Sequence, residues 1–259
     1  MPDEGRATCD RTRPAVSRFS QIRRVESTGS TNDDMAKILG ERQARGLTLV
    51  SEYQTSGAGR KGRAWIAPPG SALLFTTALP DQISTRDLWS VPFWIGLAVH
   101  DALADFGIAT QLQWPNDVLL EGAKVAGILC ISRVAASQAW VACGVGLNVA
   151  RPAETGALAD IDPAPAFLSD VREFDRGELL DTILQRADAS YEMLAAPETI
   201  ARAWERAGGI PGAHYRLRLD GSDERLEGSA VHLGTAGELL IDSHDGRHVI
   251  SQADARVLR

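Results

Sequence analysis

The stretch QLQWPNDVLLEGAKVAGILCISRVAASQAWVACGVGLNV, residues 111–149, decides the fold class of this chain. Short apolar runs at 111–114, 118–120, 125–132 and 139–149 alternate with breaks such as Pro115-Asn116-Asp117 and Glu121-Gly122. Strand-length runs with breaks this short are typical of adjacent strands joined by tight turns. The stretch therefore predicts an antiparallel or mixed sheet.

Helices flank this sheet along the sequence. The best defined is residues 88–106, where apolar side chains recur at helical spacing until Gly107 ends the pattern. A second helix begins near Ser30 or Thr31, either of which can cap it, and ends at Gly46. Helical patterns also cover 175–194 and 198–207, and further strands are predicted at 19–25, 47–53 and 72–79. The fold class is therefore α+β, with a central mixed or antiparallel sheet and flanking helices.

The C-terminal part is different. Gly208-Gly209 and Pro211-Gly212 read as a linker, and only short strand patterns with turns between them follow. They lie at 214–219, 225–233, 238–242, 247–251 and 255–258. This pattern predicts a small closed barrel. We therefore expect a polar, disordered segment over 1–17, a main domain over 18–208 and a β-barrel domain over 209–259.

Composition narrows the functional class. The chain has 259 residues, 44% of them hydrophobic and 24% charged, as in ordinary globular proteins. A net charge of -7 argues against nucleic-acid binding, which needs a positive field. The first residues lack the apolar core of a signal peptide, and no apolar run is long enough to span a membrane. Because Cys9, Cys130 and Cys143 have no metal-ligand spacing, we expect reduced thiols in a cytoplasmic protein.

A basic, glycine-rich segment carries the strongest functional signal. Residues 57–63 read GAGRKGR and directly follow a predicted strand. Glycines let the backbone approach a ligand closely, and the cations among them can hold phosphate or carboxylate oxygens. Gly57, Gly59 and Gly62 match the dinucleotide fingerprint formally, but Pro68 and Pro69 prevent the helix that the fingerprint requires. We expect a loop that binds an anionic small molecule, with a solvated charged hairpin as the alternative.

A second segment places polar groups at a strand end. Asn116 and Asp117 lie in a turn, and Lys124, seven residues after Asp117, begins the next apolar strand. An ammonium entering an apolar strand needs a partner, and a ligand oxyanion is one candidate. Taken alone, Lys124 could equally begin the strand with its ammonium in water, and Asp117 could be a simple turn residue. The basic loop makes a shared site the better interpretation.

These segments together resemble the bacterial biotin protein ligases. The resemblance runs from about residue 18 to the C-terminal barrel and is carried by paired motifs, G-x-G-R-x-G-R-x-W at 57–65 and W-P-N-D at 114–117 followed by K-x-x-G-I-L at 124–129. Residues 30–32 (STN) and 144–148 (GVGLN) also match in order and spacing. The resemblance implies a catalytic domain like that of class II synthetases over 18–208 and an SH3-like barrel over 209–259. With only about 18 residues before the sheet domain, it implies the monofunctional type without a DNA-binding domain.

The family uses ATP and Mg²⁺ to activate biotin as biotinyl-5′-AMP, then transfers biotin to one lysine of a biotin carboxyl carrier protein. By resemblance, Lys124 bridges the biotin carboxylate and the α-phosphate, while Arg60 and Arg63 lie over the adenylate. Asp117 matches the carboxylate proposed to accept the proton of the carrier lysine. The expected ligand-binding residues are Ser30, Thr31, Asn32, Gln54, Gly57, Ala58, Gly59, Arg60, Trp65, Asn116, Lys124, Gly127 and Asn148. We expect neither a protein-built metal site nor a nucleic-acid or membrane partner, and a homodimer stays open.

Individual roles follow the chemistry of biotin. Its neutral ureido group needs donors and acceptors within apolar surface, as Ser30 to Asn32 and Gln54 would supply. Trp65 either shields the mixed anhydride or packs in the core. Asn116 and Asn148 would contribute on the side of the nucleotide or Mg²⁺.

Two positions depart from the family pattern. Family members usually carry arginine at the position of Ala58 and lysine at that of Gln113. Both departures remove a positive charge from the neighbourhood of an anionic intermediate, and a charge-assisted hydrogen bond contributes roughly 1.5–3 kcal/mol. Two alternatives therefore remain: a lipoate ligase or octanoyl transferase of the same superfamily, and a non-catalytic biotin-binding module.

Overall fold

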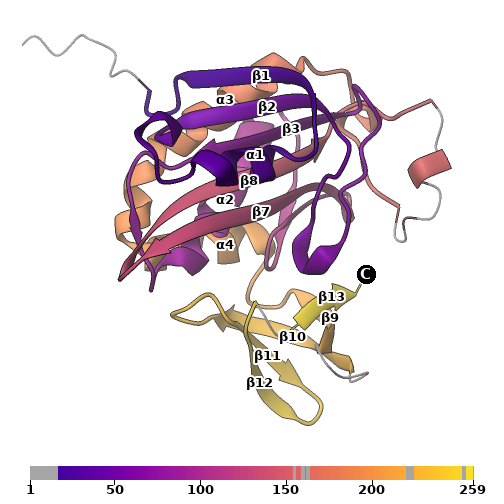
Figure 1. Cartoon of the computed structure of the whole chain (residues 1–259). Helices are drawn as coiled ribbons and strands as arrows, with labels where there is room; N and C mark the ends of the chain where they lie inside the picture. Colours follow the sequence, from indigo (N-terminus) through magenta and orange to yellow (C-terminus); the bar gives the residue numbers. More distant parts are fainter. Residues whose placement is uncertain are drawn as a thin grey trace, which may run out of the picture.

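The computed structural model describes residues 17–153, 156–158, 161, 164–219, 225–252 and 255–258. Its centre is a sheet in the order β1-β2-β3-β8-β7-β6-β5, with β4 paired to β8 (Figure 1). The strands are β1 (Gln21–Thr28), β2 (Leu47–Gln54), β3 (Ala72–Ala78), β4 (Ile83–Ser84), β5 (Gln111–Gln113), β6 (Asp117–Leu120), β7 (Ala123–Ala135) and β8 (Gln138–Asn148). Only β1 and β2 pair in parallel, so the predicted mixed sheet is confirmed.

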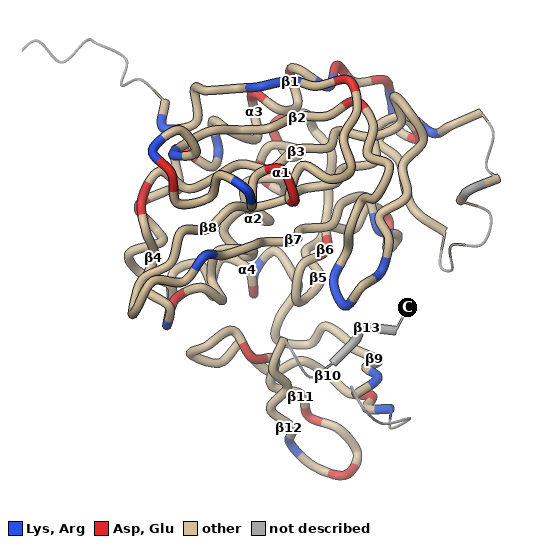
Figure 2. Tube along the Cα trace, in the orientation of Figure 1, with Lys and Arg blue, Asp and Glu red and all other residues tan. Residues whose placement is uncertain are grey.

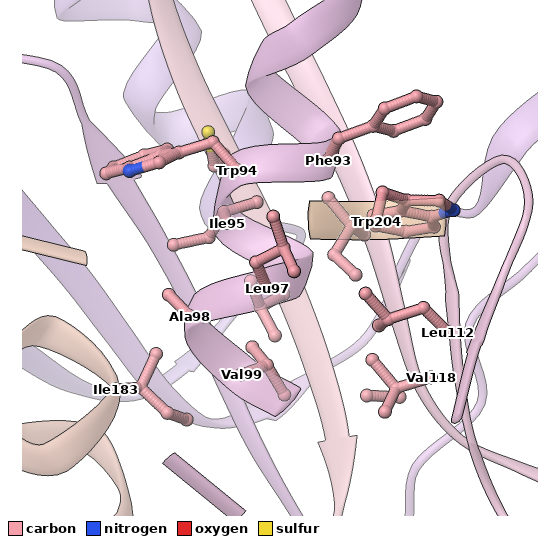
Figure 3. Packing of buried hydrophobic residues seen from close by; sticks show 14 of the residues in the cluster. Phe93, Trp94, Ile95, Leu97, Ala98, Val99, Leu112, Val118, Ile183 and Trp204 are labelled. Atoms are coloured by element: carbon pink, nitrogen blue, oxygen red, sulfur yellow. The ribbon is translucent and has the colours of Figure 1, made fainter. Parts of the chain in front are cut away.

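Three helices cover one face of this sheet (Figure 1). They are α2 (Val91–Asp105), α3 (Arg176–Ala189) and α4 (Pro197–Gly208). Helix α2 is apolar almost all round, because it is enclosed by the sheet, α3 and α4. Phe93 of α2 stacks on Trp204 of α4 with ring centroids 4.5 Å apart, and Figure 3 shows the surrounding aliphatic side chains. This layer forms the main hydrophobic core.

The short helix α1 (Thr31–Ile38) lies on the opposite face. Met35 is fully buried there against Leu47, Leu49 and Ala78. The predicted helix end at Gly46 was wrong: the helix ends at Ile38, and a 3-10 turn at Arg42–Ala44 leads into β2. Gly40 breaks the helix with a φ of 102°, a conformation that favours glycine. The short helix leaves most of this sheet face open to a ligand.

The C-terminal strands form a second, antiparallel sheet in the order β12-β11-β10-β9-β13. Its members are β9 (His214–Leu219), β10 (Arg225–Leu233), β11 (Leu239–Ser243), β12 (Gly246–Ile250) and β13 (Ala255–Leu258). This small sheet packs against the main domain through two hydrogen bonds of Trp114. Its backbone N–H donates to the Tyr215 hydroxyl at 3.1 Å, and its indole N–H donates to Gly237 O at 3.0 Å. Trp114 is itself fully buried and so anchors the two sheets to one another.

Element boundaries differ modestly from prediction. The first strand runs over Gln21–Thr28 rather than 19–25, because Phe19 packs into the core beside Trp94 instead of joining the sheet. The predicted helix 175–194 divides into α3 and a 3-10 turn at Tyr191–Ala195. Most of the expected disordered segment 1–17 lies outside the described residues. In the described part of the chain, no helix has the length and apolarity needed to cross a membrane.

Candidate active site

A cavity of about 340 Å³ lies on the sheet face that α1 leaves open. Residues from α1, the segment after β2, and strands β7 and β8 line it. The lining residues are Ser30, Thr31, Asn32, Gln54, Ala58, Gly59, Arg60, Arg63, Ala64, Trp65, Ile66, Phe75, Asn116, Lys124, Gly127, Ile128, Leu129, Gly144, Val145, Gly146, Asn148, Leu158, Ile161 and Pro165. The STN, GAGRKGR, K-x-x-G-I-L and GVGLN segments therefore meet at one place.

One end of the cavity is polar, and we call Ser30, Thr31, Asn32 and Gln54 the polar end. Ser30 occupies the N-cap position of α1, yet its side chain makes no capping hydrogen bond. Instead, Gln54 Oε1 accepts the backbone N–H of Thr31 at 2.7 Å and lies 3.0 Å from the Thr31 hydroxyl. Asn32 donates from Nδ2 to Leu129 O of β7 at 3.0 Å. These contacts fix hydrogen-bonding groups at the cavity wall.

The basic segment folds as a tight hairpin after β2. Trp65 donates its backbone N–H to Gly57 O at 2.8 Å, Ala58 and Ala64 form a β-bridge, and Gly59 donates to Arg63 O at 2.6 Å. Lys61 at the tip adopts a φ of 57°, within a 3-10 turn over Arg60–Gly62. Figure 2 shows this hairpin as a group of Lys and Arg positions beside β5 and β6. The hairpin therefore holds positive charge against the cavity.

Arg60 joins three parts of the molecule. Its guanidinium donates to Asn116 Oδ1 at 3.2 Å and also to the backbone carbonyl of Gln252, which precedes β13. Asn116 in turn donates from Nδ2 to Ile128 O at 2.7 Å. The hairpin is thereby attached both to the W-P-N-D turn and to the C-terminal sheet.

Lys124 and Asp117 face one another across the β6–β7 turn. Lys124 Nζ lies 2.6 Å from Asp117 Oδ1, and the two side chains are 24% and 13% exposed. The ammonium also lies 5.4 Å from the centre of the Trp65 ring, within cation–π range. Because Lys124 also lines the cavity, its ammonium is paired with Asp117 and at the same time faces the space that a ligand would occupy. The sequence-based idea that the ammonium merely lies in water does not hold.

Paired glycines form the floor under Trp65. Gly127 of β7 and Gly146 of β8 are directly opposed in the sheet. A Cβ on Gly146 would lie 2.4 Å from Trp65 Cε2, and one on Gly127 would lie 2.9 Å from both Lys124 Nζ and Trp65 Cζ3. Only glycine therefore lets the indole lie flat on the strands. Trp65 Nε1 is buried there without a hydrogen-bond acceptor in the part of the chain that the structure describes.

Most of the expected catalytic and ligand-binding residues line this one cavity, but two do not, namely the ligand-binding candidate Gly57 and the catalytic candidate Asp117. Gly57 serves the hairpin through its carbonyl, and Asp117 lies behind Lys124 rather than on the cavity wall. Asn148 lines the cavity while donating from Nδ2 to Ala166 O at 3.1 Å. Gln113, the second position that departs from the family, does not line it.

Sequence reasoning missed the apolar side of the cavity. The additional lining residues are Ala64, Ile66, Phe75, Ile128, Leu129, Gly144, Val145, Gly146, Leu158, Ile161 and Pro165. Gly144 and Gly146 were within the recognised GVGLN motif, and their alternation along a strand was a usable signal, because alternate residues face the same side. Leu158, Ile161 and Pro165 come from an irregular segment after β8 and gave no such signal.

The two described cysteines, Cys130 and Cys143, lie outside the main cavity, and Cys9 lies outside the described residues. Cys143 is fully buried, and burial followed by its hydrogen bond to Cys130 raises the pKa of its thiol well above the ordinary value. Cys130, directly opposite it in the sheet, lines a neighbouring cavity of about 230 Å³. A buried thiol with a raised pKa is a poor nucleophile.

Metal-binding side chains are not grouped in the described segments: no three His, Cys, Asp or Glu residues come together as a metal site.

Comparisons with known proteins agree with this geometry. The family model of the biotin/lipoate A/B protein ligase family matches residues 23–148. The biotin--[acetyl-CoA-carboxylase] ligase of Mycobacterium tuberculosis is 31% identical over 100% of this chain and 97% of its own length. The ligase of the same name from Paracoccus denitrificans is 39% identical over 88% of this chain and 96% of its own length.

The fold is also shared with solved structures. The biotin protein ligase from Aquifex aeolicus in complex with biotin and ATP superimposes with a TM-score of 0.75 at 24% identity, covering 93% of this chain and 100% of that one. The biotin protein ligase from Leishmania major in complex with biotinyl-5-AMP gives a TM-score of 0.60 at 21% identity over 90% of this chain and 99% of the other.

Proposed function

Because this chain belongs to the biotin protein ligases of the biotin/lipoate A/B protein ligase family, we propose that it joins biotin to a carrier protein through biotinyl-5′-AMP. It is an ATP-dependent biotin ligase, and its carrier would be the biotin carboxyl carrier protein of acetyl-CoA carboxylase, the enzyme in the relatives' names. The observation that carries the proposal is one cavity with hydrogen-bonding groups at one end and Lys124, Arg60 and Arg63 elsewhere on its wall. It suits a ligand with a polar neutral head and a carboxylate tail.

Biotin would lie with its ureido ring at the polar end and its carboxylate near Lys124. Thr31, Asn32 and Gln54 offer donors and acceptors there, while Phe75, Val145 and Leu129 supply apolar wall. Trp65 would cover the acyl chain, and its buried indole N–H offers a further donor. In this position Trp65 could both shield the mixed anhydride and pack against the strands, so the two roles considered from the sequence are compatible.

In the first step the biotin carboxylate attacks the α-phosphorus of ATP. A new O–P bond forms, the bond to the β-phosphate oxygen breaks, and pyrophosphate leaves. Two anions must approach one another, so fixed cations lower the barrier by stabilising charge on the phosphoryl oxygens. This role for Lys124 is supported by its contacts, because Asp117 and the indole of Trp65 hold its ammonium at the cavity wall.

Mg²⁺, when bound with ATP, supplies charge neutralisation on the leaving phosphates. Arg60 and Arg63, which line the same cavity, would bind phosphate oxygens rather than hold the ion. The protein residues themselves provide orientation: Arg60 attaches the hairpin to Asn116 and to the carbonyl of Gln252, which limits the movement of the guanidinium.

In the second step the neutral amine of the carrier lysine attacks the acyl carbon of the adenylate. The amide bond forms, AMP leaves, and the nitrogen gives up a proton. Asp117 supplies a carboxylate next to the reaction centre proposed here, since it contacts Lys124 directly and its side chain is only 13% exposed. We assign it as the proton acceptor.

The free thiols Cys130 and Cys143 are consistent with a protein that acts in a reducing cytoplasm.

The geometry disfavours the cysteine-dependent transferase alternative. Such an enzyme needs an activated thiolate at the acyl site. Cys143 is buried with a raised thiol pKa, and Cys130 lines the neighbouring cavity instead. A non-catalytic biotin-binding module would not need the Lys124–Asp117 pair.

The test is ATP–pyrophosphate exchange supported by biotin, lipoate or octanoate in separate reactions. We expect exchange with biotin in the absence of any carrier, and little with the other two acids. Exchange with lipoate instead of biotin would assign the chain to the other branch of the superfamily. Biotin binding without exchange would favour the non-catalytic module.

A further inference from the structure

Thr76 of β3 lies behind the polar end and does not line the cavity. It is fully buried, and its hydroxyl oxygen lies 2.8 Å from Thr31 Oγ1 and 2.8 Å from Asn32 Oδ1. Thr76 therefore contacts two adjacent residues at the N-terminus of α1 that face the ligand space. Its neighbour Thr77 is equally buried but belongs to the other face of β3, where it pairs with Thr48 at 3.0 Å.

The number of available protons decides how this network is oriented. Asn32 Nδ2 donates to Leu129 O, so Asn32 Oδ1 turns toward Thr76 and can only accept. Among the described residues, Thr76 is the donor to that oxygen, whereas Gln54 Oε1 accepts both the backbone N–H and the hydroxyl of Thr31. The Thr76 hydroxyl has one proton, which it directs toward Asn32 Oδ1 and Thr31 Oγ1, both 2.8 Å away, while the Thr31 hydroxyl donates its own proton to Gln54 Oε1.

This orientation sets the polarity that a ligand meets. Because its proton is given to Gln54 Oε1, the Thr31 hydroxyl can meet a ligand only as an acceptor. Gln54, whose oxygen is used by Thr31, turns its amide group outward as a donor; in the part of the chain that the structure describes, Nε2 has no acceptor. A cyclic urea both donates through N–H and accepts through C=O, whereas a dithiolane ring does neither.

We infer that Thr76 is a positioning residue that selects for a ureido ligand by holding Thr31 Oγ1 and Asn32 Oδ1 in place through its buried hydroxyl. The inference rests on the proposed function and deepens it, since it names how biotin would be distinguished from lipoate. Thr76 touches no substrate; it acts through Thr31 and Asn32.

The test compares Thr76→Val with Thr76→Ser and with Thr77→Val as the matched control. Valine keeps the shape of threonine and removes the hydroxyl. We expect Thr76→Val to raise KM for biotin about tenfold or more, which is the loss of roughly one hydrogen bond to a buried group. KM for ATP should change less than about twofold, Thr76→Ser should restore KM for biotin, and Thr77→Val should alter stability but not KM.

The outcomes separate this inference from the proposed function. If the wild-type protein does not form an adenylate from biotin, the proposed function is wrong and the inference with it. If the wild type is active but Thr76→Val binds biotin normally, or if Thr77→Val raises KM equally, only the inference is overturned. Should Thr76→Val not fold, Thr76→Cys provides a similar volume with a weaker donor, and an unchanged KM for biotin in that variant would also overturn it.

Discussion

The ammonium of Lys124 and the carboxylate of Asp117 lie 2.6 Å apart, with Lys124 on the cavity wall and Asp117 behind it. The pair links the residue expected to stabilise the adenylation step with the residue expected to accept a proton in the transfer step. One ion pair can thus hold both groups in place between the two half-reactions, and replacing each partner separately should affect different steps.

Lys124→Gln removes the ammonium and keeps most of the side-chain length. We expect adenylate formation to fall at least about 100-fold, because a fixed positive charge near the phosphoryl oxygens is lost. The measurement is the rate of pyrophosphate release with biotin and ATP. Lys37→Gln is the matched control, since Lys37 is 72% exposed and pairs only with Asp34 on the surface of α1. Wild-type release in Lys124→Gln would remove Lys124 from the mechanism.

Asp117→Asn keeps an oxygen that can accept from Lys124 but removes the basic group. We expect adenylate formation to stay within about threefold of wild type while transfer to the carrier slows about 10²–10⁴-fold, the usual contribution of a general base. Rapid-quench kinetics with preformed adenylate measure the transfer step alone. Asp105→Asn, which breaks an exposed pair with Arg186, serves as control. Equal losses in both steps would refute the assignment.

Ala58→Arg restores the charge that family members usually carry at this position. Ala58 lines the cavity within the hairpin, so an arginine there can reach an anionic intermediate. A charge-assisted hydrogen bond is worth about 1.5–3 kcal/mol, so release of the adenylate should slow about tenfold or more. Ala58→Gln adds comparable length without charge and should leave the release rate nearly unchanged. Equal effects of both substitutions would show that length, rather than charge, is responsible.

Gly146→Ala tests the glycine floor. A Cβ at this position would lie 2.4 Å from Trp65 Cε2, so the indole must move away from β8. We expect KM for biotin to rise about tenfold, with a smaller change in thermal stability because the displaced residue belongs to a hairpin rather than to the core. Gly29→Ala is the control, since a Cβ there meets nothing within 4 Å. Wild-type KM in Gly146→Ala would mean that the position of Trp65 does not matter for biotin.

The sequence predicted the main helices and strands and most of the residues that line the cavity, but it missed several element boundaries and the way the elements fit together. Lys124 is a charged residue at the start of an apolar strand, and Arg60 is one in a glycine-rich loop. Their position at the ligand cavity could therefore be predicted from the sequence. Thr76 could not, because it stands beside Thr77 in a uniformly buried strand and only the position of α1 distinguishes the two. The role of Gly146 also depends on strand register, which places it opposite Gly127 under the indole.

Helix α1 illustrates a different limit. The apolar spacing continued past Ile38, yet the chain leaves the helix there and Gly40 takes a positive φ. The sequence does hold a signal for this end, because Gly40 directly follows the C-cap residue Leu39, where glycine is typical of a helix terminus. Assigning the end to Gly46 passed over the nearer glycine. The early end is what exposes the sheet face on which the cavity lies.

The most direct test of the account is a single-turnover reaction with labelled biotin, ATP and Mg²⁺, quenched before and after the carrier protein is added. We predict that labelled biotinyl-5′-AMP accumulates on the enzyme first, and that its label then passes to one carrier lysine as AMP appears in equal amount. Labelling of the carrier without a preceding adenylate, or no adenylate at saturating biotin and ATP, would contradict the account.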